Sequence, residues 1–118
     1  MTSHRVDTHV KRNERTAIVV LGGEADLHAT GQVVGALQEA LQDEDTDATL
    51  IDLSGLTFAD SVLLNQLLTA HADHEAKGRP VLLAGPLNPA VGRLFEITGT
   101  DAVLPLVDDV ETGLRRLH

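Results

Sequence analysis

Residues 50–68 read LIDLSGLTFADSVLLNQLL, and this stretch decides the fold class of the chain. The opening LIDL is apolar except for its aspartate, which is typical of a buried central strand. Further on, Asp60 and Ser61 precede leucines at helical spacing, so a helix is expected to begin at this corner. The stretch therefore predicts a buried strand over residues 49–53, a tight corner and then a helix.

The hydroxyl of Ser61 is the first candidate for function, because it is expected at the N-terminus of this helix. A helix N-terminus offers unpaired N–H groups and the positive end of the helix dipole, and both favour a phosphate. Phosphorylation would add about −1.5 to −2 charges, and we expect the modified chain to stay folded. A partner that docks on the hydroxyl would have to desolvate a dianion, which weakens binding. The structural alternative is that Asp60 is only an N-cap and Ser61 an ordinary first-turn residue.

Strand and helix patterns alternate along the rest of the sequence. Further strands are expected over residues 6–10, 16–21, 80–84 and 103–107. Further helices are expected over residues 32–41, from Asn88-Pro89 to Gly99, and after Asp108 or Asp109. The order ββαβαβαβα needs crossover helices between parallel strands, so the expected fold class is α/β, with helices packed on a mostly parallel central sheet.

The helix after Ser61 is expected to turn one stripe of side chains toward the sheet, formed by Leu64, Leu67, Leu68 and His71. Gly78 is expected to end this helix. Gly22-Gly23 is expected to end the second strand. Pro105 favours a place at the sheet edge for the last strand, because proline has no N–H to donate to a neighbour.

The composition limits the kinds of partner. The chain has 118 residues, of which 42% are hydrophobic, and a single domain over residues 1–118 is expected. Its net charge of −9 argues against a nucleic-acid or anionic-membrane surface, because both reward clustered lysine and arginine. There is no cysteine and no apolar stretch long enough to span a bilayer, so a cytoplasmic location without membrane insertion is expected. A protein partner fits these features best.

No constellation of side chains indicates a metal site, a cofactor or catalysis. Residues 43–47 alternate aspartates like the start of a calcium loop, but Ala48 stands where such a loop needs glycine. His71 and His74 share a helical face without a cysteine or a clear third ligand. We therefore expect no catalytic residue, no cofactor and no metal, and we interpret residues 43–47 as a solvated acidic turn.

Three stretches of the sequence resemble one known family. They are GEAD over residues 23–26, IDLSGLTFADS over residues 51–61, and KGRPVLLAGPLNPAVGRLFEITGTDAVLPL over residues 77–106. In this order and spacing they are similar to the STAS domain of anti-sigma factor antagonists. The resemblance covers about residues 14–118, nearly the whole chain.

This resemblance implies a small cytoplasmic switch protein that is not an enzyme. Such proteins bind an anti-sigma factor with an ATPase fold and thereby free a sigma factor. The anti-sigma factor is also a kinase, and the serine that it phosphorylates corresponds to Ser61. The residues implied to contact the partner are Asp26, Asp60, Ser61, Val62 and Leu63. The oligomeric state stays open.

Two other interpretations stay open at this stage. Val62 and Leu63 stand where the family usually has serine and glycine, so a standing apolar contact at the corner is possible. The chain would then be a phosphorylation-independent STAS scaffold, or an accessory subunit of a larger assembly such as a membrane transporter. The other interpretation is a small-molecule or nucleotide binder that uses the carboxyl ends of the strands, where open α/β sheets tend to place ligands.

Overall fold

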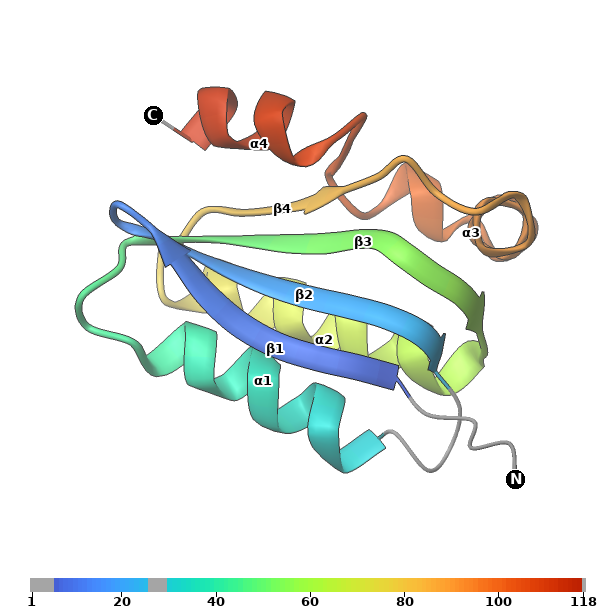
Figure 1. Ribbon diagram of the computed structural model, residues 1–118, viewed down its shortest axis with the longest axis horizontal. Helices are drawn as coiled ribbons and strands as arrows, with labels where there is room; N and C mark the ends of the chain where they lie inside the picture. Colours follow the sequence, from blue (N-terminus) through green and yellow to red (C-terminus); the bar gives the residue numbers. More distant parts are fainter. Residues whose placement is uncertain (1–5, 26–29, 118) are drawn as a thin grey trace.

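The computed structural model describes residues 6–25 and 30–117 as one sheet with helices on both of its faces (Figure 1). The strands in these residues are β1 (Val6–Asn13), β2 (Thr16–Ala25), β3 (Ala48–Ala59), β4 (Val81–Ala84) and β5 (Leu106–Val107). The helices are α1 (Thr30–Gln42), α2 (Ser61–Ala76), α3 (Pro89–Thr98) and α4 (Val110–Leu117), with a short 3₁₀ turn η2 (Thr100–Ala102). The expected α/β class and the order ββαβαβαβα are confirmed.

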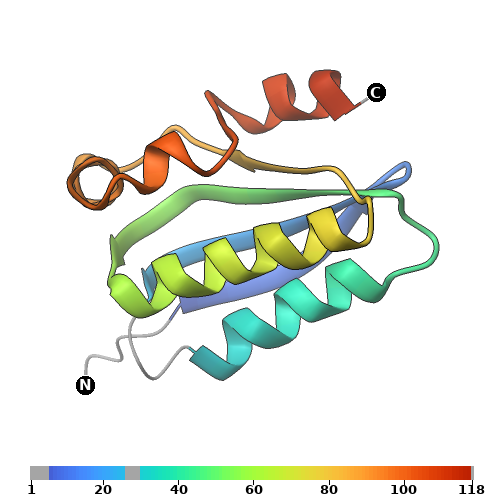
Figure 2. The ribbon, with the colours of Figure 1, turned by 180° about the vertical axis from the view of Figure 1, so that it is seen from behind.

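The strands lie in the order β1-β2-β3-β4-β5 across the described sheet. β1 pairs antiparallel with β2, and each later strand pairs parallel with its neighbour. Helices α1 and α2 cover one face and α4 covers the other, as both views show (Figures 1 and 2). Helix α3 and the first turn of α2 lie at the same end of the molecule, where β3 ends.

The core consists mainly of aliphatic side chains on both faces of the sheet. The larger cluster lies toward α1, α2 and α3, and its largest fully buried members include Leu21, Leu53, Leu56, Leu67 and Phe95. The smaller cluster, toward α4, consists of Ile18, Leu50, Ala84 and Val107. Helix α4 approaches Leu50 closely because Gly113 has no side chain: a Cβ there would lie 2.7 Å from Leu50 Cδ1.

Three strands are longer than the sequence predicts. β1 continues beyond residue 10 to Asn13. β2 continues through Gly22-Gly23 to Ala25, and β3 continues beyond residue 53 to Ala59. Their parallel pairing persists with two register shifts, one of them between Val20 and Gly22. A Cβ on Gly55 would lie 3.3 Å from the Cα of Gly22. The expectation that the glycines end β2 is therefore wrong, because they permit a close approach of two backbones inside the sheet.

The last strand is shorter than predicted. The apolar residues from Val103 onward were expected to form a strand, but the carbonyl of Thr100 accepts the N–H groups of Val103 at 3.0 Å and Leu104 at 2.9 Å. This local turn uses the groups that a strand would need, so β5 is only Leu106–Val107. Pro105 does lie at the sheet edge, where its carbonyl accepts the N–H of Leu83 at 3.0 Å.

The buried stripe of α2 includes Leu64 and Leu67 as predicted, but it continues to Ala70 and His74 rather than to Leu68 and His71. Its buried residues are Leu63, Leu64, Leu67, Ala70 and His74. Leu68 is half-buried, and the side chain of His71 is 20% exposed and pairs with Glu75 at 3.3 Å. The inward histidine is therefore His74, not His71, because the sheet meets α2 along the 63–67–70–74 line.

His74 anchors the C-terminal half of α2 to the start of β3. Its Nδ1 lies 2.7 Å from the carbonyl of Ala70, which can only accept, so Nδ1 carries the proton. Its Nε2, 2.9 Å from Thr49 Oγ1, therefore accepts the hydroxyl proton of Thr49. Burial lowers the pKa of His74, although the hydrogen bond to Ala70 opposes this shift. The imidazole is thus held in its neutral form.

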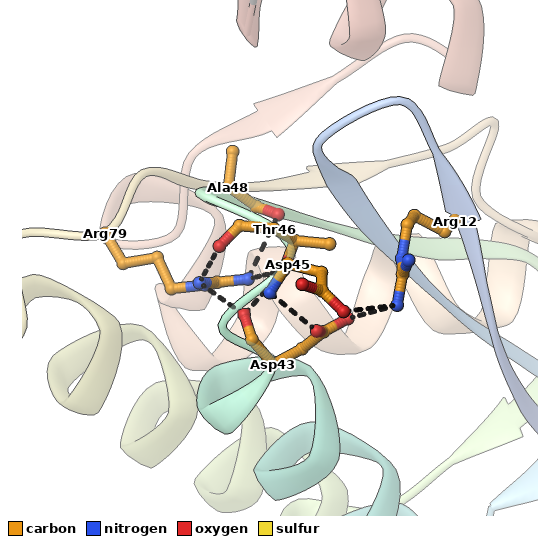
Figure 3. A network of polar contacts seen from close by, with 6 residues as sticks. All are labelled: Arg12, Asp43, Asp45, Thr46, Ala48 and Arg79. Atoms are coloured by element: carbon orange, nitrogen blue, oxygen red, sulfur yellow. Dashed lines mark hydrogen bonds and ion pairs between the residues drawn. The ribbon is translucent and has the colours of Figure 1, made fainter.

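Arg79 contacts Thr49 as well and fixes the acidic turn. Figure 3 shows the contacts of Arg79 with this turn. Its Nε donates to Thr49 Oγ1 at 3.2 Å, and its Nη1 donates to the carbonyl of Thr46 at 2.8 Å. On the other side of the turn, Arg12 of β1 contacts Asp43 at 3.2 Å and Asp45 at 3.8 Å. The turn over residues 43–47 is therefore tied to β1 and to the chain after α2, rather than only solvated.

Candidate functional site

The corner between β3 and α2 has the geometry that the sequence predicts. Asp60 has an extended backbone, with φ −119° and ψ −178°, and its Oδ1 accepts the N–H of Leu63 at 3.0 Å. Its carbonyl accepts the N–H of Leu64 at 3.2 Å, which closes the first helical turn. Asp60 is thus the N-cap of α2, and Ser61 is the first helical residue.

Ser61 is exposed at this position. The N–H groups of Ser61 and Val62 precede the first intrahelical hydrogen bond, so helix geometry gives them no acceptor within α2. The first turn of α2 contains no acidic residue, and the capping carboxylate of Asp60 offsets part of the positive end of the helix dipole. This arrangement leaves the hydroxyl accessible to a modifying enzyme and suits a phosphate in charge and hydrogen bonding.

The other two predicted contact residues in α2 differ in burial. Val62 is half-buried and so keeps part of its surface for a partner. Leu63 is only 2% exposed and belongs to the larger core cluster. The Leu63 side chain therefore packs in the core, because the third position of the helix faces the sheet, and a partner contact at Leu63 stays a prediction.

Asp26 lies outside the described residues. The end of β2 does approach the corner, because Ala25 is the register partner of Ala59, the residue before Asp60.

Two further hydroxyls, on Ser54 and Thr57, are exposed on β3. The Ser54 hydroxyl donates to Asp52 Oδ1 at 2.7 Å, and the Ser54 N–H donates to the same oxygen at 3.0 Å. Neither residue lies at a helix N-terminus. They are therefore useful comparison sites for Ser61.

An apolar groove beside the corner escaped the sequence analysis. It has a volume of about 260 Å³, and its lining residues are Phe58, Ala59, Ala90, Arg93, Leu94 and Ile97. Phe58 is 47% exposed and Ile97 is 72% exposed, which is unusual for large hydrophobic side chains in this chain. We call this feature the α3 groove. The one sequence signal was Ile97 itself, an apolar residue off the inward stripe of α3.

The described residues hold no group of three or more histidine, cysteine, aspartate or glutamate side chains that could bind a metal ion. None of the helices formed by residues 30–117 combines the length and the apolar character that a bilayer crossing needs.

The structure thus combines a mixed five-stranded sheet with a helix α2 that is capped by Asp60 and begins at the exposed Ser61. The family model described as Mlab, STAS domain matches residues 8–108. The chain therefore belongs to the STAS domain family.

Known relatives point to one branch of this family. The chain is 30% identical over 101 residues to an anti-sigma F factor antagonist of Paenibacillus polymyxa, and the match covers 86% of each protein. An anti-sigma factor antagonist from Mycobacterium paratuberculosis has a similar structure, with a TM-score of 0.80, 26% identity and coverage of 94% of this chain and 92% of that one.

The antagonist SpoIIAA shares the fold at lower identity. Its unphosphorylated form has a TM-score of 0.78 at 21% identity, with 94% of this chain and 96% of that chain covered. The phosphorylated form, described as a Bacillus cell fate determinant, has a TM-score of 0.72 at 20% identity, with 95% and 100% covered. Both forms thus share the fold of this chain.

Proposed function

We propose that this chain is an anti-sigma factor antagonist, a binding partner and kinase substrate rather than an enzyme. It binds an anti-sigma factor of ATPase and kinase fold and thereby releases a sigma factor, and phosphorylation of Ser61 ends the binding. The observation that carries the proposal is the exposed Ser61 hydroxyl at the first position of α2, beside its cap Asp60. The names of the relatives in the family support the same role. The cytoplasm is the proposed location, since sigma factors act there.

The switch follows from local electrostatics. A phosphate on Ser61 would add about −1.5 to −2 charges next to the Asp60 carboxylate. The helix N-terminus favours this charge within the chain by roughly 0.3–1 kcal/mol, so folding is retained. A partner surface fitted to a hydroxyl would have to desolvate the dianion, and a penalty of about 3 kcal/mol weakens binding roughly 100-fold.

The proposed docking surface consists of Asp60, Ser61 and Val62, together with the segment after β2 that contains Asp26. Leu63 supports this surface from below, because it fixes the first turn of α2 to the core. The contact area is centred on the end of the molecule where β2, β3 and α2 meet.

The test is phosphorylation by the purified anti-sigma factors of the organism, each incubated with the chain, ATP and Mg²⁺. Intact-mass analysis should show one phosphate on the wild type and none on Ser61→Ala. Ser54→Ala is the matched control, because it removes another exposed hydroxyl of the same segment and should leave phosphorylation unchanged.

Binding gives the second readout. The anti-sigma factor that phosphorylates the chain should bind the wild type and Ser61→Ala with the same affinity. It should bind Ser61→Asp much more weakly. Equal binding of Ser61→Ala and Ser61→Asp, with no phosphate transferred, would refute the switch and favour the phosphorylation-independent scaffold.

A further inference from the structure

The α3 groove is an apolar surface that the proposed switch leaves unexplained. Phe58 and Ile97 lie on different elements, β3 and α3, and the groove brings both together at high exposure. A large aromatic side chain that remains 47% exposed forgoes part of the free energy that burial would supply. Exposed apolar clusters of this kind mark interaction sites.

The size of the groove favours a protein over a metabolite. Its volume is about 260 Å³, whereas small-molecule sites usually enclose roughly 300–1,000 Å³. The groove also lies open to solvent along Ile97, which is 72% exposed. A space of this size and openness suits one large apolar side chain projecting from a docked surface.

The charge of Arg93 indicates which kind of partner surface would dock in the α3 groove. Arg93 lines the groove, and within residues 6–25 and 30–117 no carboxylate forms an ion pair with it. Arg12, Arg15 and Arg115 each have such a partner, whereas Arg79 and Arg116, like Arg93, form no ion pair with the described residues. In a chain with a net charge of −9, an arginine without an ion pair beside an apolar groove complements a carboxylate on the docked surface.

The groove is continuous with the proposed docking surface. Phe58 and Ala59, which form one wall, directly precede Asp60 and Ser61 in the chain. Both views place α3 and the start of α2 at the same end of the molecule (Figures 1 and 2). A partner that covers Ser61 would therefore lie at the same end of the molecule as the groove.

We propose that the α3 groove is a second contact point for the anti-sigma factor that docks on Ser61, and that it receives an apolar side chain flanked by an acidic residue. This inference rests on the proposed function. The groove supplies affinity that is independent of the hydroxyl. Phosphorylation acts on the contact at Ser61, and the groove adds a second contact to the same partner.

The experiment compares two groove variants with two matched controls, using the anti-sigma factor that binds the wild type. Ile97→Asp is paired with Val103→Asp, because Val103 is another exposed β-branched apolar residue, at 60% exposure, outside the groove. Arg93→Glu is paired with Arg116→Glu, an exposed arginine on α4. Circular dichroism confirms that all four variants fold.

The groove variants should raise the Kd for the anti-sigma factor by about tenfold or more, and the controls should stay within about twofold. In the kinase assay the same variants should raise KM for the chain and leave kcat unchanged, since the loss lies in docking. Wild-type Kd and KM for Ile97→Asp and Arg93→Glu would overturn the groove and leave the Ser61 switch intact. If no anti-sigma factor binds the wild type, both proposals fail.

Discussion

The Thr49 hydroxyl bonds to both His74 and Arg79, the two side chains that fix the C-terminal half of α2. It should therefore contribute strongly to the stability of the fold. Thr49→Val keeps the shape of the side chain and removes only the hydroxyl. The buried Nε2 of His74 then loses its donor, and the half-buried Nε of Arg79 loses an acceptor. An orphaned buried polar group costs about 1–3 kcal/mol. Because Arg79 keeps its bond to Thr46, we expect a total near 2 kcal/mol.

Urea unfolding at pH 8 measures this loss. With a slope of about 2 kcal/mol per molar, the midpoint should fall by about 1 M. Thr57→Val is the matched control, because Thr57 lies on the same strand with its side chain exposed, and its free energy of unfolding should change by less than about 0.5 kcal/mol.

A double-mutant cycle isolates the Thr49–His74 contact. In a His74→Leu background, the step from Thr49 to valine should cost less, because no imidazole nitrogen is left without a donor. If Thr49→Val costs the same in both backgrounds, or costs less than about 0.5 kcal/mol in the wild type, the account of this network is refuted.

The same histidine makes stability depend on pH. Burial depresses the pKa of His74 in the folded state, so the unfolded state binds the proton more tightly. The contribution to stability is fully present above the unfolded pKa of about 6.5 and is lost as the pH falls below it. The slope reaches at most about 1.4 kcal/mol per pH unit. This slope should vanish in His74→Leu and persist in His71→Gln.

Two further predictions concern packing and capping. Gly113→Ala should destabilise the chain by about 1–3 kcal/mol, because the new Cβ would meet Leu50. Gly35→Ala in α1 places a Cβ that meets nothing within 4 Å, so it should stabilise the chain by about 0.5–1 kcal/mol. The urea midpoints of the two variants report the difference. Asp60→Ala removes the cap on α2 and should lower the free energy of unfolding by about 1 kcal/mol, which appears as a fall in Tm of about 4 °C. Asp60→Asn should keep most of the stability, because its amide oxygen also accepts the Leu63 N–H.

Much of the fold could be predicted because its signals are local. Asn88-Pro89 begins α3 and Asp60 begins α2 as expected, since a capping side chain and its N–H partner lie within a few residues. The strand limits could not be predicted in this way. Gly22 looks like a strand end in the sequence, and only its pairing opposite Gly55 makes it part of the sheet.

In the candidate site, too, local features could be predicted and features that depend on tertiary packing could not. The exposure of Ser61 follows from its place as the first residue of a capped helix, so local pattern was sufficient. The burial of Leu63 and His74 depends on which side of α2 meets the sheet, and helical spacing leaves that phase uncertain by one position. The α3 groove joins Phe58 to Ile97 across two elements, and no local pattern in the sequence reports such a contact.

The two ends of α2 explain why a charge on Ser61 would act on a partner and not on the fold. The C-terminal half of the helix is fixed by His74 and Arg79, and its buried stripe runs back to Leu63 in the first turn. Sliding or rotating the helix to relieve a new charge would break these contacts together. The N-terminus of α2 also favours an anion. A phosphate there would therefore exert little repulsion that could move the helix. A phosphate on Ser61 would therefore act on whatever surface covered the serine rather than on the fold.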